Sequence, residues 1–130
     1  MKVLLVDDSA TNLEILRAYL TVFGHHTVDT AYCAMVAETQ LGMNVYDVMI
    51  FDYLLARSLS EESGTGLDLL RWCRKQRIPT PCIILSAVSP EELKNCQEIA
   101  AAENLGPMTA VCKLSAMRGE LLAAIRYMAK

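Results

Sequence analysis

Five times along this chain, a short run of apolar or β-branched residues is followed by a segment of helical period. This alternation constrains the fold more than any other feature. The run 48–51 is apolar at every position, which is typical of a strand buried on both faces of a parallel sheet that helices cover. Five strand–helix units joined by right-handed crossovers predict an α/β fold with an open, doubly wound parallel sheet. The predicted strands cover 3–6, 26–31, 48–51, 82–85 and 108–112, of which 26–31 is the weakest candidate.

Local signals predict where most of the helices begin and end. Leucines recur at helical spacing after the first run, and Gly24 closes that helix. Gly42 is the predicted stop of the second helix, because glycine is favoured just past a helix C-terminus. Further helices are predicted over 34–41, 67–77 and 116–128, the last with Ser115 as its N-cap.

The segment 89–92 opens a fourth helix with three signals at once. Ser89 is the predicted N-cap, and Pro90 suits the first helical position. Glu92, three residues after the cap, completes a capping box with Ser89.

Length and composition restrict the classes of function that remain. The 130 residues fit one domain over 1–130, with no output domain attached. A net charge of −3 gives no electrostatic footprint for nucleic acid or an anionic membrane, and no apolar run approaches the roughly 18 residues of a membrane span. The five cysteines form no C-x-x-C pair and are odd in number, so we predict neither a zinc site nor a disulfide framework. The same cysteine pattern predicts a reduced, cytoplasmic setting.

Chemically active side chains follow four of the predicted strands. In an open parallel α/β sheet, sites lie at the carboxyl ends of the strands. We therefore expect these side chains to meet at one edge of the sheet. They are Asp7, Asp8 and Ser9 after the first strand, Asp52 after the third, Ser86 after the fourth and Lys113 after the fifth.

This set of groups suits phosphoryl chemistry. Three neighbouring carboxylates repel one another unless a cation joins them, and Mg²⁺ prefers such hard oxygen ligands. A lysine and a hydroxyl beside the metal are equipped to hold the oxygens of a phosphoryl group. A carboxylate can also attack phosphorus and form an acyl phosphate. Asp52 stands alone on the central strand while Asp7 and Asp8 form a pair suited to the metal, so we assign Asp52 as the nucleophile.

Taken together, the motifs resemble a known family. The segments V-L-L-V-D-D-S (3–9), the apolar strand that ends in Asp52, I-L-S-A (84–87) and the late Lys113 look like the response regulator receiver domain of two-component signalling systems. Each motif alone is weak, but all four occur in order along the whole chain. The resemblance implies a flavodoxin-like (βα)5 fold with strand order 2-1-3-4-5.

The resemblance also implies a role for each site residue. Asp52 is expected to accept a phosphoryl group from a histidine of a partner kinase or phosphotransfer protein, and the signal is expected to reach a downstream effector protein or a covalently linked output domain. No enzymatic activity is implied beyond the domain's own phosphorylation and dephosphorylation. The expected Mg²⁺ ligands are Asp7, Asp8, Asp52 and the main-chain carbonyl of Leu54, and the expected phosphoryl contacts are Ser86, the amide of Ala87 and Lys113.

The sequence departs from the family pattern in three places. Leu114 follows Lys113 where proline in a cis peptide is usual, and we expect a trans bond there. Ala110 occupies the position where many receivers carry the aromatic ring that reports phosphorylation. The loop after Asp52 is longer than usual, with extra residues over 58–63, and the apolar Leu54 and Val88 stand where polar groups often tune dephosphorylation.

Two other functions compete with the phosphoacceptor. A pseudo-receiver keeps the fold as a phosphorylation-independent binding module, and the missing proline and aromatic favour it. An enzyme on a similar scaffold is disfavoured, because a dehalogenase-like phosphatase needs an acid at Leu54. A P-loop NTPase needs a G-x-x-x-x-G-K-[ST] motif that the chain lacks, and a flavodoxin-type phosphate loop is incompatible with Asp7 and Asp8.

Overall fold

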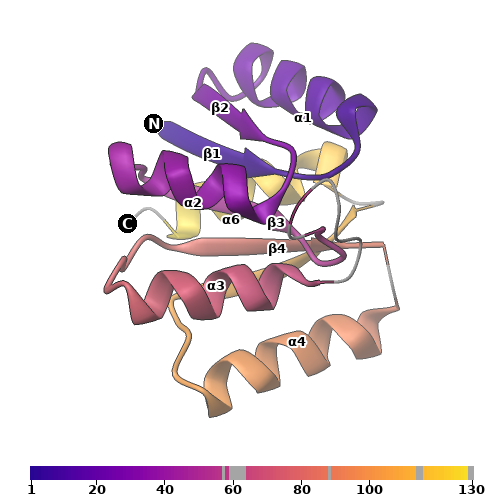
Figure 1. Cartoon of the computed structure of the whole chain (residues 1–130). Coiled ribbons are helices and arrows are strands. Elements are labelled where there is room, and N and C mark those ends of the chain that lie inside the picture. Colours follow the sequence, from indigo (N-terminus) through magenta and orange to yellow (C-terminus); the bar gives the residue numbers. More distant parts are fainter. Residues whose placement is uncertain (57, 59–63, 88, 114–115, 129–130) are drawn as a thin grey trace.

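The protein folds around a single five-stranded parallel sheet (Figure 1). The computed structural model describes residues 1–56, 58, 64–87, 89–113 and 116–128, without the side chains of 117 and 118. The strands pair in the order β2-β1-β3-β4-β5, which confirms the predicted doubly wound fold and its strand order. They are β1 (Lys2–Val6), β2 (Thr27–Ala31), β3 (Val48–Asp52), β4 (Cys82–Ser86) and β5 (Met108–Cys112).

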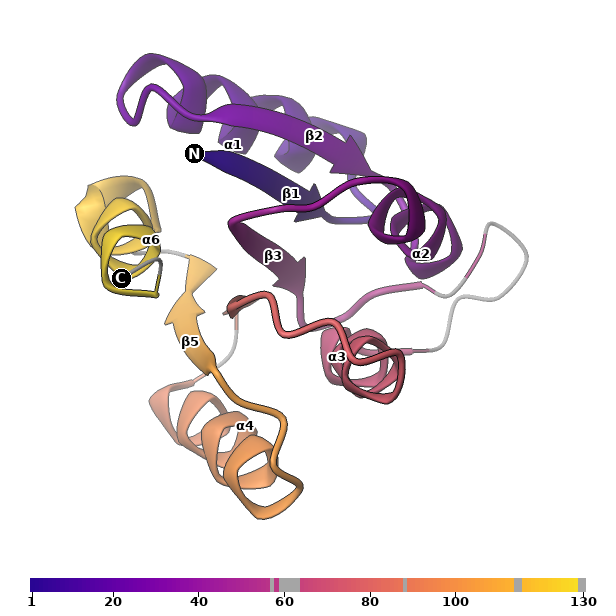
Figure 2. The same cartoon turned by 90° about the vertical axis from the view of Figure 1, so that its left-hand side faces the viewer.

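Helices cover both faces of this sheet (Figure 2). One core cluster joins α2, α3 and α4 to one face, and a second cluster joins α1 and α6 to the other. The helices are α1 (Ala10–Val22), α2 (Ala34–Met43), α3 (Gly66–Lys75), α4 (Pro90–Ala102), the π-helical turn η1 (Ala116–Glu120) and α6 (Leu121–Met128). Among the described helices, none combines the length and the apolar character that crossing a membrane requires.

The register of the strands brings their carboxyl ends to one edge of the sheet. Val6 pairs with Phe51, and Asp52 pairs with Leu85 on the next strand. All five residues of β3 and all five of β4 are buried, as the unbroken apolar runs predicted. The side chains that end β3 and β4, and those that directly follow β1 and β5, therefore lie at the same edge of the sheet.

The predicted stop of the second helix is wrong. α2 continues through Gly42 to Met43, and Asn44 is its C-cap. The main-chain N–H of Asn44 donates to Gln40 O at 2.9 Å, and the Asn44 amide donates to the same oxygen at 3.3 Å. Gly42 lies in open space, so no close approach requires a glycine there.

The predicted capping box at the start of α4 is also only half right. Ser89 is the N-cap and Pro90 occupies the first turn, but the Ser89 side chain makes no capping hydrogen bond. The N–H of Glu92 instead donates to the Ser89 main-chain carbonyl at 3.0 Å. A complete capping box occurs in α3, between Thr65 and Asp68.

The last predicted helix is not regular from its start. Residues 116–120 form a π-helical turn, and α-helical geometry begins at Leu121. Gly119 in that turn has φ +95°, a left-handed conformation that glycine adopts without strain. The predicted cap at Ser115 lies outside the described residues.

Four of the five cysteines are buried, as predicted for small core residues. Burial raises the pKa of the Cys73 thiol to about 12, so this thiol stays protonated at neutral pH. Trp72 and Tyr19 pack against the two core clusters, which agrees with a structural role for both.

Arg74 of α3 makes hydrogen bonds to the segments that precede β4 and β5. Its guanidinium donates to the main-chain carbonyls of Leu105 at 2.8 Å, Ile78 at 2.6 Å, Thr80 at 3.0 Å and Pro107 at 3.1 Å. Replacing it with methionine keeps most of the side-chain volume and removes all four bonds. We expect Arg74→Met to lower the free energy of unfolding by about 2–3 kcal/mol, measured by urea unfolding.

The matched control is Lys75→Met, an exposed substitution in the last turn of the same helix. A loss for Arg74→Met no larger than the loss for this control would contradict the role given to the guanidinium.

Candidate metal centre

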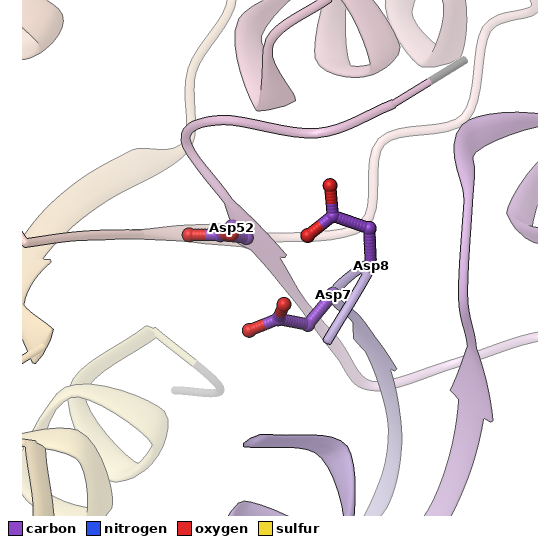
Figure 3. Close-up of side chains that lie close together, drawn as sticks. All are labelled: Asp7, Asp8 and Asp52. Atoms are coloured by element: carbon purple, nitrogen blue, oxygen red, sulfur yellow. The ribbon is translucent and has the colours of Figure 1, made fainter. Parts of the chain in front are cut away.

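Three aspartates meet at the carboxyl edge of the sheet (Figure 3). Asp7 and Asp8 follow β1 directly, and Asp52 is the last residue of β3. Each offers a carboxylate oxygen, and these oxygens all lie within 4.8 Å of one another. Asp7 and Asp52 are buried, whereas Asp8 is exposed. The sheet therefore assembles the predicted trio, with Asp8 on its solvent side.

Lys113 connects two of these carboxylates. It follows β5, and its Nζ lies 3.0 Å from Asp52 Oδ1 and 3.2 Å from Asp7 Oδ2. Both carboxylates are almost fully buried, so these ion pairs are poorly screened by solvent. One ammonium facing three carboxylates still leaves an excess of negative charge.

The two oxygens of Asp7 have different surroundings. Oδ1 accepts a hydrogen bond from the Ser9 N–H at 2.9 Å. Oδ2 is buried and accepts no hydrogen bond from any described residue, and its contact with Lys113 Nζ at 3.2 Å is an ion pair. A buried carboxylate oxygen without a hydrogen bond is costly. An oxygen of this kind, next to Asp8 and Asp52, fits a hard cation such as Mg²⁺.

The pKa values of Asp52 and Lys113 reflect the same imbalance of charge. Burial raises the pKa of Asp52 to about 6; the ion pair with Lys113 works against this rise, and the nearby Asp7 and Asp8 add to it. Burial lowers the pKa of Lys113, but the ion pairs with Asp52 and Asp7 outweigh burial and raise it overall. Lys113 is therefore charged at neutral pH, and a cation at the site would favour the ionised form of Asp52.

The other predicted site residues lie at the same edge. Ser86 ends β4 one residue beyond Leu85, the residue that pairs with Asp52. It is buried, and Ala87 follows it at the surface. Leu54 lies two residues beyond Asp52 and exposes 66% of its surface. Their roles toward metal and phosphoryl group stay predictions.

Leu54 forms an antiparallel bridge with Thr65. The bonds of this bridge come from the neighbouring residues, since Gly66 N–H donates to Tyr53 O at 2.7 Å and Leu55 N–H donates to Gly64 O at 3.2 Å. The bridge itself thus engages neither the N–H nor the carbonyl of Leu54.

Sequence reasoning did not identify Gly66, which packs against the end of β3, or the capping pair Thr65 and Asp68 next to it. Gly66 approaches Asp52 so closely that a Cβ on it would lie 2.5 Å from the Asp52 main-chain oxygen. The preceding Thr65, with Asp68 three residues later, has the spacing of a capping box. That spacing was the available signal.

Of the departures from the family pattern, the structure describes Ala110 and Leu54. Ala110 is partly buried on β5 and packs against the core cluster that joins α2, α3 and α4 to the sheet. Leu114, Val88 and most of the longer loop, residues 57 and 59–63, lie outside the described residues.

Comparison with known proteins decides the family. A family model described as response regulator receiver domain matches residues 3–126. This chain belongs to that family. Receiver domains are signalling domains that interact with histidine kinases and output domains.

Individual relatives agree with this assignment. The sensory/regulatory protein RpfC of Xanthomonas campestris pv. campestris is 28% identical over 137 residues, which cover 99% of this receiver domain. The match covers 18% of RpfC, so the chain spans less than a fifth of the length of that relative.

Solved structures agree as well. A Francisella response regulator receiver domain superposes with a TM-score of 0.78 at 26% identity, over 98% of this chain and 95% of that one. The chemotaxis protein CheY4 of Vibrio cholerae gives a TM-score of 0.75 at 25% identity, over 98% of this chain and 97% of that one.

The pKa of Asp52 predicts how stability depends on pH without metal. Folding raises this pKa from about 3.8 to about 6, so the folded state favours the protonated carboxyl. The contribution of Asp52 to stability is then full below about pH 4 and falls as the pH rises through 6. Relative to Asp52→Asn, the wild type should lose about 2–3 kcal/mol of unfolding free energy between pH 4 and pH 7, measured by urea unfolding in EDTA.

Asparagine resembles the protonated carboxyl in size and polarity. The contributions of all other titrating groups therefore cancel in the difference between the wild type and Asp52→Asn. A difference between the two proteins that stays constant from pH 4 to pH 7 would contradict the raised pKa.

Proposed function

We propose that this receiver domain accepts a phosphoryl group on Asp52, in a Mg²⁺-dependent reaction, from a histidine of a kinase or a histidine phosphotransfer protein. The observation that carries the proposal is the position of the buried Asp52 carboxylate, 3.0 Å from Lys113 and beside Asp7 and Asp8. Membership of the receiver domain family supports the same reaction.

The reaction assigns a task to each group of the chain. One carboxylate oxygen of Asp52 bonds to phosphorus while the bond from phosphorus to the histidine nitrogen breaks, and the imidazole leaves with that electron pair. Lys113 pairs with a phosphoryl oxygen, and the Ser86 hydroxyl and Ala87 N–H donate to the others.

Asp7, Asp8 and the Leu54 carbonyl, together with Asp52, would hold Mg²⁺. When bound, Mg²⁺ offsets the negative charge of the carboxylates and of the phosphoryl oxygens. Asp7 Oδ2 is the oxygen best prepared for this task, because it is buried and accepts no hydrogen bond from the described residues.

The consequence of phosphorylation is a change in local charge. A phosphoryl group adds about −1.5 to −2 charges at the edge of the sheet. We place the domain in the cytoplasm, with a downstream effector protein or a covalently linked output domain as the recipient of the signal. The multidomain relative RpfC supports a role within a larger signalling protein or relay.

A phosphorylation-independent binding module is the competing function. Ala110 favours it, because no aromatic ring is available at that position of β5 to report phosphorylation. The complete set of three carboxylates and Lys113 opposes it, since a pure binding module has no need to bury these charges.

Incubation with acetyl phosphate and Mg²⁺, followed by intact-mass spectrometry, separates the two functions. We expect the wild type to gain the mass of one phosphoryl group, and Asp52→Asn to gain none. The wild type in EDTA is the control for the metal.

A wild type that keeps its mass with acetyl phosphate and also with a phosphorylated histidine donor would rule out the phosphoacceptor. The binding module would then be the better account of the fold.

A further inference from the structure

The chain leaves β3 and enters α3 through a short pair of antiparallel segments. Residues 53–55 lie beside 64–66, joined by the bond from Gly66 N–H to Tyr53 O and the bond from Leu55 N–H to Gly64 O. We call these residues the neck. The neck begins one residue after Asp52, and it contains Leu54.

The second segment of the neck is fixed by the capping box of α3. The Thr65 hydroxyl accepts from Asp68 N–H at 3.2 Å, and the Asp68 carboxylate accepts from Thr65 N–H at 3.0 Å. The other oxygen of Asp68 accepts from Arg71 at 2.9 Å, and Arg71 makes a bidentate pair with Glu103 at the end of α4. The box therefore holds Thr65 in one extended conformation at the start of the helix.

Gly66, the residue after Thr65, is in direct contact with the end of β3. A Cβ at this residue would lie 2.5 Å from the Asp52 oxygen and 3.1 Å from Phe51 Cβ, so the two backbones are already packed together. A shift of Thr65 and Gly66 would move the backbone of Asp52 with them.

The first segment of the neck is held from its other side as well. Leu55 is almost fully buried, and Ala34 N–H at the start of α2 donates to Ala56 O at 3.0 Å. Because Leu54 lies between these fixed points, its main-chain carbonyl has a defined direction, away from Thr65.

We propose that Thr65 and Asp68 are positioning residues of the metal centre. Through the neck, they hold the Asp52 carboxylate and the Leu54 carbonyl where both can bind the cation that Asp7 and Asp8 would also hold. This inference rests on the proposed Mg²⁺ site. It goes beyond it because neither residue contacts the metal, and because the same hydrogen bonds would otherwise serve only to start a helix.

The simpler interpretation of the capping box makes a different prediction. If Thr65 and Asp68 only stabilise α3, removing the box lowers the free energy of unfolding and leaves Mg²⁺ affinity unchanged well below the unfolding midpoint. If they position the ligands, the affinity falls even where the protein is fully folded.

The test is a titration with Mg²⁺ alone, followed by amide NMR of the whole chain at pH 7. We expect Thr65→Val and Asp68→Ala to weaken Mg²⁺ binding about threefold to tenfold, which is roughly 0.7–1.4 kcal/mol of binding free energy. Thr65→Ser keeps the hydroxyl and should restore the wild-type dissociation constant. In EDTA, the amide hydrogens of Leu55 and Gly66 should exchange faster in Thr65→Val than in the wild type.

Lys75→Ala is the matched control, because it changes the exposed end of α3 and leaves the neck intact. Dissociation constants of Thr65→Val and Asp68→Ala within twofold of the wild type would overturn the positioning role, as would an equal loss in Lys75→Ala. A wild type that fails to bind Mg²⁺ at all would overturn the metal centre itself and this inference with it.

Discussion

Lys113 lies between two buried carboxylates, and the site depends on the sheet holding these charges together. Its ammonium is 3.0 Å from Asp52 and 3.2 Å from Asp7, at the edge where β1, β3 and β5 all end. Burial of this kind is unfavourable unless each charge has a partner. The parallel register supplies the partners, because it aligns the ends of strands that are distant in sequence. The negative charge that remains is the physical reason to expect a cation there.

Much of this arrangement could be predicted from the sequence, because strand ends in a parallel sheet converge. The apolar runs located all five strands to within one residue at each end, and the residues after them became the site. The same reasoning failed where a local signal competes with its surroundings. Gly42 did not end a helix, because Asn44 makes the capping bonds two residues later.

Other features could not be predicted, because they depend on contacts between distant segments. The close approach of Gly66 to the Asp52 carbonyl exists only once α3 packs beside β3. The same is true of Asp7 Oδ2, whose burial without a hydrogen bond depends on the final position of Lys113. Sequence spacing alone identifies residue types at a site, whereas packing decides which atoms remain available to a ligand.

The side chains near the site bear on how the proposed phosphorylation of Asp52 would reach a partner. Ala110 is too small to report phosphorylation by rotating a ring, although its place on β5 is the expected one. Residues 53–56 and 64–66 are held by hydrogen bonds from both helices: Ala34 N–H of α2 donates to Ala56 O, and Gly66 N–H of α3 donates to Tyr53 O. A movement of Asp52 on the proposed phosphorylation would therefore reach α2 and α3 through these hydrogen bonds.

In the proposed site, the carboxylates, Lys113 and a cation balance one another's charge. The most direct measurement is the free energy of unfolding of the wild type and of Lys113→Met, in EDTA and in saturating Mg²⁺ at pH 7. We predict that Mg²⁺ stabilises both proteins, by RT ln(1 + [Mg²⁺]/Kd). We also predict that it stabilises Lys113→Met more, because that site has lost its own positive charge. Unfolding free energies that do not respond to Mg²⁺ in either protein would contradict this balance of charge.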